Sequence, residues 1–218
     1  MITFFTLYSS AILRILNLIV WSIWFSKREI KGFNKVTILY FLGFNLIHVI
    51  WNSAMLIGHN HPKIYITFWI LIVIFEILMV LTILFSINNL QKKFHDYYII
   101  IIGILSIPVI LAGIISALKW DYKPINVMDF NVQLLLTLGS IWILKNLLAR
   151  EDFLENIETF LIFSGMIMLF SLHILASNSQ YFGFLKNWKI ANSATIISQI
   201  FWLGGVFTSW KIRSKYLS

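Results

Sequence analysis

Seven long apolar segments, separated by short polar loops, constrain the fold of this chain more than any other feature. The segments cover approximately residues 3–25, 36–57, 64–88, 97–118, 130–148, 159–177 and 190–210. A helix needs about 20 mostly apolar residues to cross the hydrocarbon core of a bilayer, and each segment comes close to that length. We therefore predict an all-α, polytopic membrane protein whose residues 1–218 form one domain, a bundle of seven transmembrane helices.

The composition supports this fold class and limits the functions open to the chain. Of the 218 residues, 59% are hydrophobic and 12% are charged, whereas soluble domains carry about 25% charged residues. The loops are too short for a kinase, ATPase or DNA-binding domain, and the lack of cysteine excludes disulfides and thiolate metal sites. The net charge is +8, and the basic residues lie mostly in short loops beside the apolar segments. We therefore expect membrane lipids, and not nucleic acid, as partners.

The distribution of basic residues predicts an orientation in the membrane. Of the 17 Lys and Arg residues, eleven lie in or beside the loops after the first, third and fifth segments or in the C-terminal tail, and five lie by the other loops. Basic residues concentrate in cytoplasmic loops. We therefore predict a multi-pass protein of a bacterial cytoplasmic (inner) membrane, with the N-terminus outside and the C-terminus cytoplasmic. The first segment has no basic residues before it, so we expect a retained helix and not a cleaved signal peptide.

Polar residues recur at helical spacing within several of the apolar segments. Asn45, His48 and Asn52 are spaced i, i+3 and i+7, which places them on one face of a helix. Three further segments carry similar stripes, namely Ser10, Arg14 and Asn17; Gln133, Thr137 and Ser140; and Asn192, Thr195 and Gln199. Such a face either lines a polar site or joins neighbouring helices by hydrogen bonds.

Two residues of opposite charge, Arg14 and Glu76, lie near the centres of their segments. An isolated charge at the middle of a bilayer costs about 3 kcal/mol on insertion scales, so the two are most simply explained as a pair. The alternative explanation is that Glu76 is protonated and neutral, whereas Arg14 keeps its proton under ordinary conditions. The partner of Arg14 is therefore Glu76, a set of backbone carbonyls or a bound anion.

From these patterns we predict a polar site inside the bundle. The residues expected to bind a ligand or protons are Arg14, Asn17, Asn45, His48, Asn52, Glu76 and Gln199, and the secondary candidates are Gln133, His173 and Asn192. His59 and His61 are weak candidates for a surface metal site, because two ligands on a six-residue loop are usually just solvated. We otherwise expect no metal, no cofactor and no catalytic residue.

Two classes of function fit this site. The first is a sensor or accessory module that binds a small ligand or a partner protein in the bundle and acts through a separate signalling or transport protein. The second is a small solute or proton-coupled transporter, which should show interrupted helices; Gly and Pro interruptions are sparse in this chain, which favours the first class. No hydrolase, zinc-protease or nucleotide-binding motif is present, so an intramembrane enzyme using His48, Glu76 and His173 is a distant third.

Overall fold

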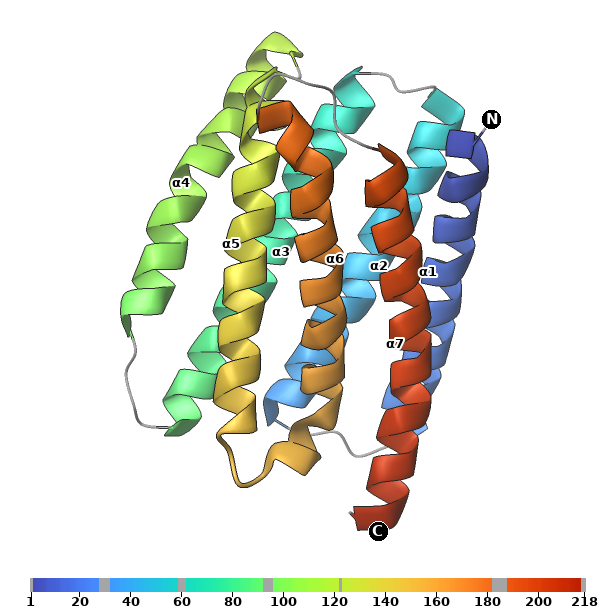
Figure 1. Ribbon diagram of the computed structural model, residues 1–218, viewed down its shortest axis with the longest axis vertical. Coiled ribbons are helices and arrows are strands. Elements are labelled where there is room, and N and C mark those ends of the chain that lie inside the picture. The colour runs from blue at the N-terminus through green and yellow to red at the C-terminus, as the bar shows by residue number, and fades with distance from the viewer. Residues whose placement is uncertain are drawn as a thin grey trace.

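A computed structural model of the chain describes residues 2–27, 32–58, 62–91, 96–121, 123–181 and 188–216. In these ranges the chain forms seven α-helices and one short 3-10 helix, η1 (Phe153–Asn156). The α-helices are α1 (Ile2–Lys27), α2 (Gly32–Gly58), α3 (Pro62–Gln91), α4 (Asp96–Lys119), α5 (Lys123–Leu148), α6 (Ile157–Tyr181) and α7 (Trp188–Tyr216). They run up and down side by side, so the two termini lie at opposite ends of the bundle (Figure 1).

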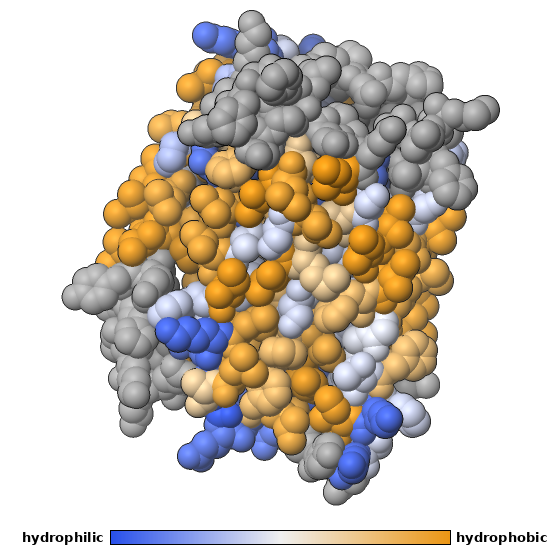
Figure 2. All heavy atoms as spheres, in the orientation of Figure 1, coloured by the Kyte–Doolittle hydropathy of each residue, from blue (hydrophilic) through white to orange (hydrophobic). Residues whose placement is uncertain are grey.

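All seven of these described α-helices are long and apolar enough to cross a membrane, as expected for a multi-pass membrane protein. Large hydrophobic side chains cover the outside of the bundle, as at Ile12, Leu78, Leu118 and Phe207, each about half exposed or more. Figure 2 shows this apolar surface across the middle of one face, with most of the hydrophilic residues toward its two ends. In water such a surface would be unfavourable, whereas lipid chains solvate it well.

Six helices enclose the interior of the bundle. α1 packs against α2 and α7, α2 packs against α3 and α6, and α5 packs against α3 and α6, while α6 also packs against α7. α4 lies at one edge, where it packs against α3 and α5 (Figure 1). The polar interior described below is therefore formed by every helix except α4.

The helices extend beyond the apolar segments at several ends. α5 begins at Lys123, with Pro124 in its first turn, where proline is well tolerated because its missing N–H would be unpaired anyway. Hydropathy alone puts this start near residue 130, since residues 123–129 are less apolar. α7 likewise continues to Tyr216, beyond the expected residue 210. Both extensions bring charged residues into the bundle: Asp129 at one end and Arg213 at the other.

A close contact between α6 and α7 fixes the centre of the bundle. Trp202 of α7 is fully buried, and its indole Nε1 donates a hydrogen bond of 3.0 Å to the backbone oxygen of Ile162 in α6. The indole ring lies directly against Gly165, where a β-carbon would overlap the ring. Glycine is therefore required at position 165 for this approach of the two helices.

Candidate functional site

A cavity of about 80 Å³ lies inside the bundle and is lined by residues of α1, α2, α3, α5, α6 and α7. Its polar and aromatic lining residues are Arg14, His48, Trp51, Tyr65, Trp69, Glu76, Asp129, Gln133, Phe170, His173 and Thr195. Asp129 and Thr195 lie near the starts of their helices and His173 lies near the end of α6. These residues place the cavity in the half of the bundle that contains the N-terminus, because α5 and α7 start and α6 ends at that end (Figure 1).

Arg14 contributes a buried guanidinium to one wall of this cavity. The side chain is 3% exposed, and its Cζ lies 5.2 Å from the ring centroid of Phe44. Its Nε and Nη1 are buried and have no hydrogen-bond partner. Leaving buried donors without acceptors is costly, so the Arg14 site has capacity for a bound group that accepts hydrogen bonds.

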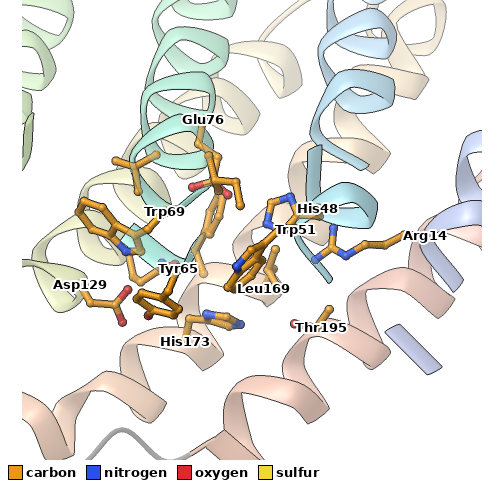
Figure 3. Close-up of a pocket in the computed structure, with 14 residues that line it drawn as sticks. Arg14, His48, Trp51, Tyr65, Trp69, Glu76, Asp129, Leu169, His173 and Thr195 are labelled. Carbon is orange, nitrogen blue, oxygen red and sulfur yellow. The ribbon is translucent and has the colours of Figure 1, made fainter. Parts of the chain in front are cut away.

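The opposite wall combines two carboxyl groups with aromatic rings. Glu76 of α3 and Asp129 of α5 are both buried, at 4% and 6% exposed. In Figure 3, Asp129 lies with Tyr65 and Trp69 on the side of the cavity away from Arg14, and Glu76 also points inward from that side. The cavity therefore carries groups of opposite formal charge on different walls.

Two histidines line the cavity, and each has one ring nitrogen engaged by a backbone carbonyl. His48 Nδ1 donates to the backbone oxygen of Phe44 at 2.8 Å. In a neutral imidazole with that tautomer, Nε2 is a hydrogen-bond acceptor. His173 Nε2 donates to the backbone oxygen of Ala191 at 3.2 Å, a contact that joins α6 to α7.

Five of the residues predicted from the sequence thus line one cavity, namely Arg14, His48, Glu76, Gln133 and His173. The predicted amides behave differently. Asn17 Nδ2 donates to the side-chain oxygen of Gln199 at 2.8 Å and to its backbone oxygen at 3.0 Å, which joins α1 to α7. Neither of these two residues lines the cavity.

Asn45, Asn52 and Asn192 also lie away from the cavity lining. Asn45 Nδ2 donates to the backbone oxygen of Phe41 at 2.9 Å within α2, and Asn52 Nδ2 donates to Ser10 Oγ of α1 at 3.4 Å. Asn192 is half-buried near the start of α7. His59 and His61 fall outside the part of the chain that the structure describes.

Several cavity residues do not follow from the sequence patterns. Asp129 lies four residues before Gln133, so it extends the stripe of that helix by one turn. It was missed because the predicted helix began at residue 130. Trp51, Tyr65 and Trp69 carry no pattern that separates them from the aromatic residues found near the ends of most membrane helices.

A layer of buried aromatic rings lies between the cavity and the C-terminal end of the bundle. Trp21, Phe41, Phe44 and Trp202 are each at most 1% exposed. Ring centroids lie 5.5 Å apart for Trp21 and Phe41, 4.9 Å for Phe41 and Trp202, and 6.0 Å for Phe44 and Trp202. Phe44 also lies 4.3 Å from the His48 ring, so the layer begins directly below the cavity.

A second buried polar cluster lies beyond this layer, around Glu158 at the start of α6. The Glu158 carboxylate is fully buried and forms an ion pair with Arg213 of α7, whose Nη2 donates to Oε2 at 2.6 Å. It also accepts hydrogen bonds from Ser209 Oγ at 2.6 Å, Asn34 Nδ2 at 2.9 Å and Trp24 Nε1 at 3.4 Å. These donors come from α1, α2 and α7, so Glu158 ties four helices together.

The loop between α5 and α6 carries a separate, more exposed ion pair. Arg150 donates from Nε and Nη2 to the two carboxylate oxygens of Asp152, at 2.6 Å each. These hydrogen bonds hold the pKa of Asp152 below its ordinary value. Like the Glu158 cluster, this pair lies at the end of the bundle opposite the cavity.

Comparisons of the chain with protein-family models, with curated proteins and with solved structures find no match. The cavity geometry is accordingly the basis for assigning a function.

Proposed function

We propose that this protein is a membrane-embedded module that binds a small solute in the cavity around Arg14 and acts through a separate partner protein. The observation that carries the proposal is the guanidinium of Arg14, which is buried at the cavity wall with Nε and Nη1 unpartnered. A buried charge in a membrane helix marks a functional site by default, because its burial is expensive. A bound solute that accepts hydrogen bonds from these nitrogens offsets that cost.

Two other lining residues have buried polar atoms that lack a partner. Trp51 Nε1 is a donor and Gln133 Oε1 is an acceptor. Buried polar atoms in folded proteins are nearly always hydrogen-bonded, so finding several at one cavity supports a ligand that supplies both acceptors and donors. The cavity volume of about 80 Å³ has room for several water molecules or one small solute.

The partial exposure of two lining residues near the N-terminal end supports access from that end. Arg14, His48 and Glu76 are buried, whereas Tyr65 and Thr195, nearer that end, are half-buried. The aromatic layer stands on the other side. Under the orientation predicted from the basic residues, the ligand would enter from outside the cell.

A route closed at one end supports a sensor or accessory module over a transporter, which must open alternately to both sides. The transporter stays as the second candidate, because Arg14, Glu76 and Asp129 bring ionisable groups to one buried cavity as coupled carriers do. If the purified protein in sealed vesicles takes up the bound solute, the transporter is the correct function.

The proposal is tested by ligand screening on the purified protein. We expect at least one small organic ion to raise the unfolding temperature of the wild type and to bind measurably by calorimetry. The Arg14→Gln variant should lose this response, whereas Arg150→Gln, the same change at the far end of the bundle, should keep it. Equal binding by wild type and Arg14→Gln would exclude the cavity as the site.

Access is tested by labelling, since the chain has no cysteine. A single Thr195→Cys variant places a thiol at the cavity, and Ser214→Cys places one at the opposite end of α7. In intact cells, an impermeant maleimide should label position 195 and spare position 214, and a bound ligand should slow labelling at 195 only. Labelling of position 214 but not 195 would reverse the orientation.

A further inference from the structure

The two walls of the cavity differ in chemistry. Arg14 on α1 presents guanidinium nitrogens without partners, and His48 on α2 lies beside it, next to Phe44. This wall suits an anionic group, because guanidinium donates hydrogen bonds in the planar geometry that carboxylates and phosphates accept.

The wall formed by α3 and α5 suits a cation. Glu76 and Asp129 line it together with Tyr65 and Trp69 (Figure 3). Trp51 of α2 extends the aromatic surface, with its ring centroid 6.1 Å from that of Tyr65. Aromatic rings beside carboxyl groups form the surroundings in which ammonium groups bind, through the negative faces of the rings and through direct charge attraction.

A ligand with a single charge fits only one of these walls. An anion bound at Arg14 would face the carboxyl groups of Glu76 and Asp129 across the same small cavity. A simple cation held by the carboxyl groups would face Arg14. Placing like charges together disfavours a ligand, whereas complementary charges at both ends favour it.

We infer that the ligand of this cavity is a small zwitterion, with its acidic group at Arg14 and its ammonium group between Asp129, Glu76 and the aromatic rings. This inference rests on the proposed function and narrows it to one chemical class. The volume of about 80 Å³ holds roughly five to eight water-sized groups at about 10–15 Å³ each. That limit matches a free amino acid with a short side chain, a betaine, or the head group of a zwitterionic lipid.

The first test compares matched ligands on the wild-type protein, so that no variant has to fold. The zwitterions are alanine and glycine betaine. Propionate and 3,3-dimethylbutanoate lack the ammonium group, and ethylamine and tetramethylammonium lack the acid. We expect at least one zwitterion to bind at least about tenfold more tightly than both of its analogues by calorimetry. The inference is overturned if propionate or ethylamine binds as tightly as alanine and if 3,3-dimethylbutanoate or tetramethylammonium binds as tightly as betaine. The proposed function would still stand in that case.

The second test assigns the two ends of the ligand to the two walls. Asp129→Asn should weaken the preferred zwitterion at least about tenfold but leave its acid-only analogue unchanged. Asp152→Asn makes the same chemical change outside the cavity and should alter neither affinity. If Asp129→Asn weakens both ligands equally, the ammonium group is not held at that wall and the inference fails.

Free solutes and lipid head groups share this chemistry, and the membrane environment separates them. The protein is placed in nanodiscs of phosphatidylglycerol, with or without phosphatidylethanolamine. Competition by phosphatidylethanolamine against alanine or betaine would assign the site to a head group, and unchanged affinity would assign it to a free solute. If neither the zwitterions nor phosphatidylethanolamine bind, the inference is wrong, while the wider screen of organic ions still decides the proposed function.

Discussion

The contact between Gly165 and Trp202 provides a sharp test of the packing that holds the aromatic layer. Gly165→Ala adds one methyl group to α6. That β-carbon would overlap Nε1 of the Trp202 indole and would lie 2.5 Å from Cε2 and 2.7 Å from Cδ1, where ordinary contacts begin at 3.4 Å. The indole cannot move away freely, because it is fully buried and its Nε1 is bonded to the backbone of Ile162.

The expected cost follows from two opposing effects. Overpacking a tightly packed core usually costs about 1–3 kcal/mol, and displacing the indole also breaks a buried hydrogen bond, whose loss costs about 1–3 kcal/mol. Replacing Gly by Ala in a helix returns about 0.5–1 kcal/mol. The net destabilisation is therefore about 1–5 kcal/mol. The aromatic layer should also shift, because the ring centroids of Trp202 and Phe41 lie 4.9 Å apart.

The assay is unfolding of the purified protein in detergent, followed by tryptophan fluorescence, with Gly204→Ala as the matched control. Gly204 lies on α7, and a β-carbon there meets nothing within 4 Å. The control should be neutral or slightly stabilising. If Gly165→Ala unfolds at the same denaturant concentration as Gly204→Ala, the two helices do not approach as described here, and the aromatic layer is not fixed by this contact.

Three further predictions concern charged groups. Glu158→Ala should destabilise the protein by about 3–5 kcal/mol, because it leaves the partly buried guanidinium of Arg213 without its partner. Glu158→Gln should destabilise the protein less, and chemical unfolding measures both variants. Arg150 lowers the pKa of Asp152, so their pair adds stability at neutral pH that is lost as the pH falls through that lowered pKa, below about 4. The unfolding temperatures of wild type and Asp152→Asn should therefore differ slightly at pH 7 and converge in acid, since this pair is partly exposed. Glu76→Gln alone should destabilise more than Glu76→Gln combined with Arg14→Gln, and independent effects in that double-mutant cycle would show that the two charges are not coupled.

The sequence predicted the all-helical fold and its seven apolar helices because the length and hydropathy of a membrane span depend on the local chain alone. It also led to Arg14, His48 and Glu76 as buried polar residues, since a charge or imidazole in a long apolar segment is expensive anywhere but in the interior. All three lie at the cavity in the structure.

The hydrogen-bond partners of the amides could not be predicted from the sequence. Asn17 bonds to Gln199, 182 positions further along the chain, and that pairing depends on the rotation and neighbourhood of α1 and α7. A polar stripe shows that a helix face is polar, but not whether its amides meet another amide, as Asn17 does, or a backbone carbonyl of their own helix, as Asn45 does.

The burial of acidic residues near the helix ends could not be predicted from hydropathy either. Hydropathy places the boundary of a span where charge begins, so Asp129 and Glu158 were assigned to loops or to the edges of helices. In the structure both are buried, because neighbouring helices extend beyond the apolar segments and enclose them. Asp129 was recoverable from its spacing to Gln133, whereas nothing in the local sequence reveals that Arg213 reaches Glu158.

The contrast between the two buried polar clusters is the strongest reason to regard the cavity as a binding site. Around Glu158, an ion pair and several hydrogen bonds satisfy the carboxylate from four helices, as expected for a cluster that fixes helix positions. Around the cavity, by contrast, Arg14, Trp51 and Gln133 keep buried polar atoms without partners. Unpartnered atoms also occur away from the cavity, as at Asn17 and Gln199, but those side chains are neutral and bond to each other, whereas leaving a buried guanidinium incomplete is more costly. The incomplete guanidinium therefore supports the proposal that a bound molecule completes this cluster.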